Sequence, residues 1–173
     1  DRKWLKNLLD RYTKEIGVPF RCFGKVTLLD EELARMLKNA GCYCIEFGMQ
    51  TVNEQVKRDV LNRTETNARS FETYATCDRV GLNYDIDHMF GLPGERERDH
   101  IYGALFYSKL SYLNRLKVHN LTYFPKMPIL KRAREEGLLS DTNVKDIESG
   151  RIGNFFHGGD VKDTRVRRIN KCF

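Results

Sequence analysis

The chain has 173 residues, of which 40% are hydrophobic and 31% charged, and it carries a formal net charge of +6 with a pI near 9.1. This hydrophobic fraction supports a folded core, which excludes a largely disordered chain, and no apolar run approaches the roughly 20 residues that cross a bilayer. We expect a cytoplasmic protein without a membrane segment. Its five cysteines are odd in number and lie mostly in apolar segments, which favours reduced, buried thiols over a disulfide framework.

The positive charge raises the question of an anionic partner. A basic run near the end of the chain, Arg165, Arg167, Arg168 and Lys171, would suit nucleic acid. No cluster of base-stacking aromatic residues accompanies the run, and a solvated helix face has the same composition. We therefore do not expect a nucleic-acid partner, but a non-catalytic basic module that binds RNA remains one alternative.

Helical and extended patterns alternate from the start. Apolar residues from Trp4 to Ile16 follow one stripe of a helix. A strand is expected at residues 20–26, and Asp30 should cap the next helix.

A second strand is expected at residues 43–47, and it has two different faces. Tyr43, Ile45 and Phe47 would form the apolar face that packs on helices. Four residues would lie on the other face: Cys42, Cys44, Glu46 and Gly48. Glu46 is therefore expected to point toward a cavity.

The stretch from Asn83 to Arg98 shows the strongest pattern. After two helices, capped by Asn53 and Thr66, alternating apolar residues predict a strand that stops at the turn Gly91-Leu92-Pro93-Gly94. Asp85 and Asp87 share one face of this strand, and carboxylates without partners do not pack against helices. We interpret the stretch as the wall and rim of a binding site.

The remaining elements follow the same alternation. A buried helix stripe is expected from four residues: Ile101, Leu105, Phe106 and Leu110. A strand at residues 118–124 and a short helix at residues 129–136 complete a domain that spans residues 1–139. Residues 140–173 are expected to be a polar extension with a terminal helix.

Strands that alternate with helices imply parallel strands joined by right-handed crossovers, hence an α/β partial barrel. Four strands cannot close a barrel. Ligands bind at the carboxyl ends of such strands, which places residues 48–51, 90–95 and 124–125 around one mouth.

Three short motifs in this order resemble a known family. They are Gly-Met-Gln-Thr at residues 48–51, Val-Leu-Asn-Arg at residues 60–63 and Phe-Gly-Leu-Pro-Gly-Glu at residues 90–95. Together they resemble the radical S-adenosylmethionine (radical SAM) superfamily, especially its cobalamin-associated and coproporphyrinogen-dehydrogenase-like branches. The resemblance implies a partial TIM-like barrel of six strand-helix units, of which this chain carries about the last four.

The resemblance also assigns ligand roles to single residues. Gln50 resembles the glutamine near the ribose and amino-acid part of S-adenosylmethionine, although an amide there also caps helices. Arg63 resembles the arginine that reaches the cofactor carboxylate, although arginines are common at helix ends. Asp87 resembles the aspartate that faces the nucleoside, with Glu46 on the neighbouring strand.

Four further residues resemble those that meet the adenine. Phe90, Gly91 and Leu92 would offer backbone amides and an apolar surface, and an ordinary strand-to-helix turn has the same sequence. Thr122 falls where the last strand of the family offers backbone, and a β-branched residue is also normal in a strand.

The Cys-x-x-x-Cys-x-x-Cys loop that holds the family's [4Fe-4S] cluster is absent from this sequence. We therefore expect a fragment whose partner is the missing N-terminal part of the same domain, with no bound cofactor, no metal site and no catalytic residue of its own. The resemblance implies that the parent enzyme cleaves S-adenosylmethionine reductively for a radical transfer or rearrangement on an unknown small-molecule substrate, in some branches with cobalamin. An exposed edge strand at residues 20–26 would favour self-association.

A second alternative needs no cofactor. An α/β barrel enzyme of ordinary polar chemistry could use Asp85, Asp87 and Glu46 as acid and base.

Overall fold

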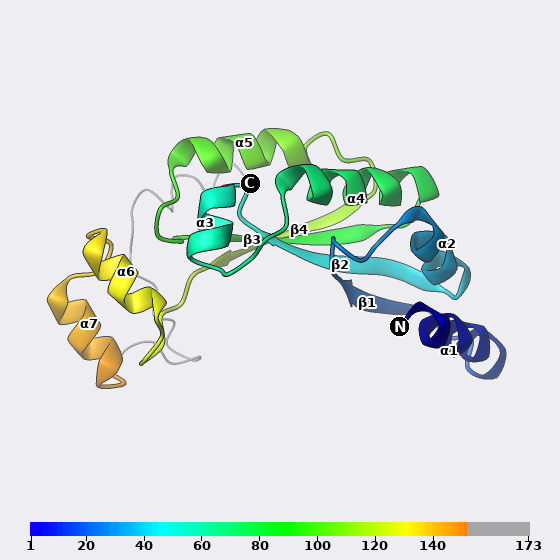
Figure 1. Ribbon diagram of the computed structural model, residues 1–173, viewed down its shortest axis with the longest axis horizontal. Coiled ribbons are helices and arrows are strands. Elements are labelled where there is room, and N and C mark those ends of the chain that lie inside the picture. The colour runs from blue at the N-terminus through cyan, green and yellow to red at the C-terminus, as the bar shows by residue number, and fades with distance from the viewer. Residues whose placement is uncertain (152–173) are drawn as a thin grey trace. The chain divides into compact units, whose positions relative to one another are not determined.

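A computed structural model of the chain describes residues 1–151 (Figure 1). The basic run and most of the expected terminal extension lie outside these residues. The elements are α1 (Arg2–Glu15), β1 (Phe20–Gly24), α2 (Glu31–Asn39), β2 (Cys42–Gln50), α3 (Glu54–Asp59), α4 (Asn67–Val80), β3 (Tyr84–Phe90), α5 (Glu97–Tyr107), β4 (Leu113–Asn120), α6 (Ile129–Glu135) and α7 (Asp141–Glu148).

The four strands form one sheet in the order β1-β2-β3-β4. β1 pairs parallel with β2, and β2 pairs parallel with β3, with helices in the connections between them. The chain thus has the predicted α/β fold, a partial TIM-like barrel of parallel strand-helix units.

The chain divides into two compact parts. The first part contains Asp1–Gln50, Glu65–His88 and Leu105–Lys117. The second part contains Thr51–Thr64, Met89–Ala104 and the described residues from Val118 onward.

Aromatic side chains form the core of the first part. The rings of Phe47, Tyr74 and Tyr84 are fully buried, and their centroids lie 5.4 to 6.4 Å apart. This contact packs α4 against β2 and β3 (Figure 1). The local sequence sets the limits of α4, because the Thr66 hydroxyl caps its first turn and Gly81 ends it at φ 69°.

A second, smaller core lies in the second part. It joins α6 and α7 through five buried residues, Tyr123, Leu130, Ala133, Leu139 and Ile147. None of the helices within residues 1–151 has the length and apolar composition needed to cross a lipid bilayer.

The structure corrects two of the expected elements. The last strand is Leu113–Asn120 rather than residues 118–124. Its polar residues on one face of the sheet hide the apolar pattern by which a strand is predicted. The expected buried stripe of α5 is also wrong: Ile101 and Leu105 are 50% and 61% exposed, whereas His100 and Tyr107 are buried.

Candidate functional site

Three carboxylates share one face of the sheet in the first part. Tyr84 is fully buried on the helix side of β3, so Asp85 and Asp87 lie on the opposite face. β2 places Glu46 in register with Asp85. The alternation in the sequence predicted this grouping, which we call the polar face.

A β-bulge near the start of β2 changes the predicted faces of two residues. Phe20 pairs with Cys42 and Arg21 with Cys44, so Tyr43 is the extra residue and is 53% exposed. Tyr43 is therefore not part of the buried apolar face. The bulge also turns Cys42 to the helix side, whereas Cys44 keeps its predicted place on the polar face.

Asp85 on the polar face is 1% exposed. It accepts hydrogen bonds from Arg21 Nη2 at 3.1 Å, Asn114 Nδ2 at 2.8 Å and Arg115 Nη2 at 2.8 Å. Burial alone would raise the pKa of Asp85, but the bonds from Asn114 and Arg115 outweigh it and lower that pKa.

Glu46 occupies a similar environment and is 5% exposed. It accepts hydrogen bonds from Lys117 Nζ at 2.5 Å and from Arg21. Burial would raise the pKa of Glu46, yet the hydrogen bond and charge of Lys117, together with Asp87 and Arg21, lower it. The same Lys117 Nζ lies 3.9 Å from Asp87 Oδ1.

The polar face borders a pocket of about 360 Å³ within the first part. Six residues line it: Arg21, Tyr43, Cys44, Asp85, Asn114 and Arg115. Because cations hold Asp85 and Glu46 in the ionised form, neither carboxyl is suited to donate a proton near pH 7. This arrangement disfavours Asp85 and Glu46 as the acid in the ordinary acid-base alternative.

Gln50 ends β2 in an unusual conformation. Its φ is +63°, and the register of β2 against β3 shifts between Gly48 and Gln50. The amide oxygen of Gln50 is buried and has no hydrogen-bond partner among the described residues. A buried acceptor in a strained backbone position suits a ligand that donates a hydrogen bond.

Three of the predicted adenine contacts lie together in the second part. Phe90 is fully buried, with its ring centroid 4.9 Å from that of His100. Gly91 has a φ of +83°, a value that favours glycine, and Leu92 N donates to Glu95 Oε2 at 3.3 Å. The turn therefore has the predicted backbone, and its contact with a ligand stays a prediction.

The remaining two predicted residues also belong to the second part. Arg63 follows α3, and its backbone N–H donates to Lys57 O at 2.8 Å. Thr122 lies two residues beyond β4 and is partly buried. The roles of Arg63 and Thr122 as cofactor contacts stay predictions.

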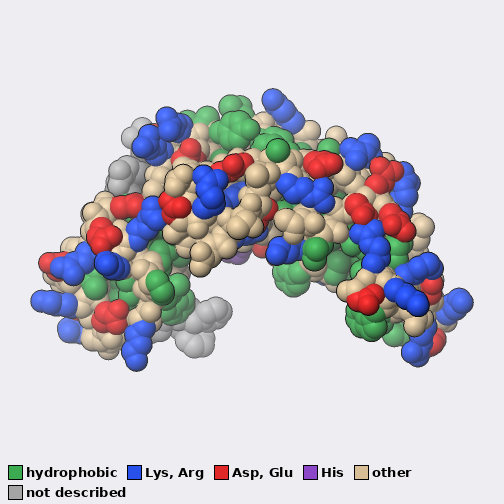
Figure 2. All heavy atoms as spheres, in the orientation of Figure 1, with side chains coloured by type: hydrophobic (Ala, Val, Ile, Leu, Met, Phe, Trp, Pro, Cys, Tyr) green, Lys and Arg blue, Asp and Glu red, His purple; other side chains and the backbone are tan. Residues whose placement is uncertain are grey.

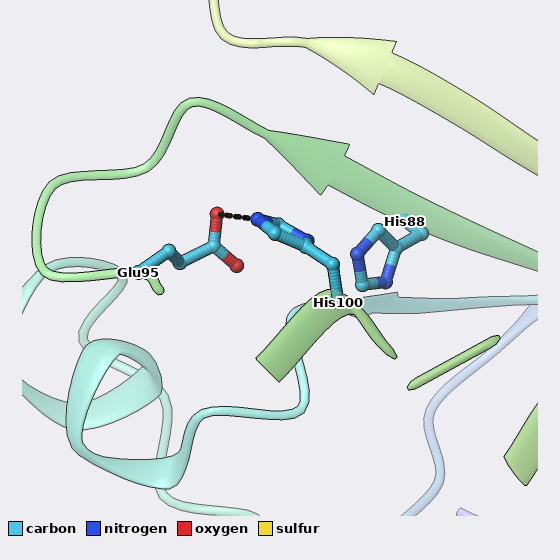
Figure 3. Close-up of side chains that lie close together, drawn as sticks. All are labelled: His88, Glu95 and His100. Carbon is cyan, nitrogen blue, oxygen red and sulfur yellow. Dashed lines mark ion pairs between the residues drawn. The ribbon is translucent and has the colours of Figure 1, made fainter. Parts of the chain in front are cut away.

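A buried acid-histidine pair in the second part was not predicted. Glu95 Oε2 lies 3.5 Å from His100 Nε2, and the side chains are 3% and 5% exposed (Figure 3). Burial raises the pKa of Glu95 to about 8, with a further contribution from Asp99, although bonds to Thr51 and Leu92 oppose the rise. Burial also lowers the pKa of His100. The only signal in the sequence was a glutamate directly after the glycine turn.

The described cysteines do not fit an iron-sulfur cluster. The radical SAM motif places three thiolates on one loop with Cys-x-x-x-Cys-x-x-Cys spacing, whereas the described cysteines lie on β1, β2 and α4: Cys22, Cys42, Cys44 and Cys77. Burial raises the pKa of Cys44 to about 11 and that of Cys77 to about 12, which disfavours their thiolates. Cys172 lies outside the described residues.

No family model and no curated protein matches the chain. Solved structures do match it. Coproporphyrinogen III oxidase HemN from Escherichia coli, described as a radical SAM enzyme, is 15% identical with a TM-score of 0.64, and the match covers 99% of this chain and 37% of HemN. The radical SAM methyltransferase TsrM from Kitasatospora setae, solved with cobalamin and a [4Fe-4S] cluster, is 19% identical with a TM-score of 0.59, over 75% of this chain and 27% of TsrM.

SuiB from Streptococcus suis is a third match, 16% identical with a TM-score of 0.54, over 87% of this chain and 34% of SuiB. At these identities the likeness shows the fold, and the chain has the fold of radical SAM enzymes. The fold predicted from the resemblance to radical SAM enzymes is therefore confirmed. The chain spans 27% to 37% of the length of these three structures.

Proposed function

We propose that the chain is part of a radical SAM enzyme, in which its four strands belong to the half-barrel that binds S-adenosylmethionine. The observation that carries this proposal is the fold shared with HemN over 99% of the chain. Because no described cysteines fit a cluster, the proposal places the cluster-binding cysteines in a segment N-terminal to residue 1. That segment would be the natural partner of this chain.

Glu46, Gln50 and Asp87 are the residues of the first part that we assign to the cofactor. S-adenosylmethionine carries hydroxyl and ammonium donors, and two carboxylates and a buried amide oxygen are matching acceptors. When bound beside a reduced cluster, the cofactor supplies radical chemistry by cleavage of its sulfonium. The assigned role of Asp87 is to hold the nucleoside, and that of Gln50 is to accept a hydrogen bond from the ribose or amino-acid part.

The residues of the second part complete the assignment by resemblance. Arg63 would hold the cofactor carboxylate, because a guanidinium can donate two parallel hydrogen bonds to it. Phe90, Gly91, Leu92 and Thr122 would meet the adenine. The chemistry proposed for the whole enzyme is a radical transfer or rearrangement on a small molecule.

The test uses the protein that joins this chain to its upstream segment, reconstituted with iron and sulfide without oxygen. We expect the absorption and electron paramagnetic resonance of a [4Fe-4S] cluster, and release of methionine from S-adenosylmethionine after reduction with dithionite. Cobalamin, if this protein takes it, adds its own absorption bands. Absence of both the cluster and the methionine release would overturn the proposal.

A binding measurement separates the assigned site from the fold. In the same reconstituted protein, Asp87→Asn should weaken S-adenosylmethionine binding about tenfold, which corresponds to about 1.4 kcal/mol. Asp10→Asn is the matched control, because Asp10 pairs with Lys6 on the exposed surface of α1. Equal affinities of the two variants would remove Asp87 from the site while leaving the family assignment intact.

A further inference from the structure

Cys22 and Cys42 form a close thiol pair within the first part. Their Sγ atoms are 3.8 Å apart, although the residues come from different strands, β1 and β2. The bulge at Tyr43 is the reason, because it turns Cys42 to the helix side of the sheet, where Cys22 also lies. A regular β2 would instead place Cys42 on the polar face.

The two thiols differ in access and in acidity. Cys22 is partly exposed, whereas Cys42 is 4% exposed. The hydrogen bond between them lowers the pKa of Cys22, against the effect of burial, and it raises the pKa of Cys42 together with burial. Since the thiolate is the nucleophile in disulfide exchange, Cys22 is the thiol that reacts first.

We propose that Cys22 and Cys42 are a redox-active dithiol that closes to an intramolecular disulfide on reaction with a low-molecular-weight disulfide such as glutathione disulfide. The Cys22 thiolate attacks one sulfur of glutathione disulfide, forms a mixed disulfide and releases one glutathione thiolate. Cys42 then loses its proton and attacks the Cys22 sulfur, which forms the Cys22–Cys42 bond and releases the second glutathione. Overall, the two cysteine thiols lose two electrons and two protons. Glutathione disulfide takes them up and becomes two molecules of glutathione.

The geometry makes this pair selective among the described cysteines. The Sγ separation must fall from 3.8 Å to about 2.05 Å. Within residues 1–151, β1 has one strand neighbour, β2, and Cys22 lies on this edge strand. Cys44 faces the opposite side of the sheet, and Cys77 is fully buried on α4.

The experiment treats the reduced chain with glutathione disulfide, alkylates the remaining thiols and maps the peptides by mass spectrometry. We expect a Cys22–Cys42 disulfide and a loss of two of the five free thiols under denaturing conditions. Cys42→Ser should stop the reaction at a glutathione adduct on Cys22. Cys22→Ser should give neither a glutathione adduct nor a disulfide at Cys42. Cys44→Ser is the control and should still form the disulfide.

Three results would overturn the proposal. These are a wild-type chain that keeps all five thiols, a disulfide that joins another pair, and a wild-type adduct on Cys22 that never closes. Circular dichroism of each variant shows whether it folds. The wild-type peptide map decides the question even where a variant does not fold.

Discussion

Burial alone does not set the charge of a carboxyl group in this chain. Asp85 and Glu95 are both almost fully buried, yet the pKa of Asp85 is lowered and that of Glu95 is raised to about 8. The difference lies in their partners: Asp85 contacts two guanidinium groups, whereas Glu95 lies near Asp99 and a histidine whose own pKa burial has lowered. Each environment predicts a different dependence of stability on pH.

Asp85→Asn is expected to lower the free energy of unfolding at pH 7 by about 2 kcal/mol, because it leaves the cations of the polar face without their shared carboxylate. Arg21 and Arg115 are 36% and 51% exposed, so solvent compensates part of a larger loss. Since the native pKa of Asp85 lies below its unfolded value, its contribution is present above the unfolded pKa and is lost as the pH falls through the native one. Urea titrations should show that the stability lost in Asp85→Asn is smaller at pH 3.5 than at pH 7. A loss at pH 7 no larger than that of Asp10→Asn would contradict a stabilising role for the bonds between Asp85 and its cations.

Glu95→Gln is expected to change the pH dependence in the opposite sense. A carboxyl whose native pKa is raised to about 8 stays protonated in the folded state while the unfolded state loses its proton, so wild-type stability falls as the pH rises toward 8. Between pH 6.5 and pH 8 the wild type should lose about 2 kcal/mol relative to Glu95→Gln, at up to about 1.4 kcal/mol per pH unit. His100, whose pKa burial lowers, is present in both proteins, so its titration cancels in the comparison. Parallel stability curves would show that Glu95 is already ionised when folded.

At the level of elements, local signals predicted where α2 and α4 begin. Asp30 and Thr66 cap α2 and α4 as expected, because a side-chain oxygen satisfies the first free N–H groups of a helix. β4 was misplaced because its sequence is polar on the face where Arg115 and Lys117 bond to the carboxylates. A strand that lines a polar face loses the apolar pattern by which strands are found.

The candidate site was predictable only in its acidic half. Asp85 and Asp87 follow the alternation of one strand, and Glu46 follows that of another, so their common face could be inferred. Their partner Arg21 lies 64 positions from Asp85, and nothing local links the two. The bulge at Tyr43 is equally hidden, because it depends on pairing with β1 rather than on the residues of β2 alone.

α7 lies at the start of the expected polar extension, and its sequence carries a helix-capping signal. Ser140 forms a capping box, in which its hydroxyl accepts from Asn143 N while Asn143 Oδ1 accepts from Ser140 N, and Ile147 anchors the helix in the core of the second part. Ser140→Ala should destabilise α7 by about 1 kcal/mol. Hydrogen exchange of amides 141–148 should accelerate roughly fivefold. Ser149→Ala, at the other end of α7, is the control, and equal acceleration by both variants would contradict a specific role of the cap.

For the whole molecule, net charge is a poor guide to function. Many of the cations that give the chain its charge of +6 are bonded to its own carboxylates, as on the polar face. Positive and negative side chains are mixed over the surface that Figure 2 shows, without one extended basic area on that face. The face that Figure 2 shows thus gives no support to the RNA-binding alternative.

We expect the chain to self-associate through its first strand and helix. β1 has one strand neighbour among residues 1–151, Phe23 on it is 82% exposed, and Trp4 and Ile16 of α1 are 63% and 60% exposed. An open strand edge beside exposed apolar residues favours pairing with a second copy. We expect sedimentation velocity to show concentration-dependent association of the chain alone, and Phe23→Lys to shift it at least severalfold toward the monomer, because a charged edge residue opposes strand pairing. Ile101→Lys, which changes an exposed apolar residue of α5, should leave the association unchanged; equal effects of the two substitutions would assign the association to general surface hydrophobicity instead of the β1 edge.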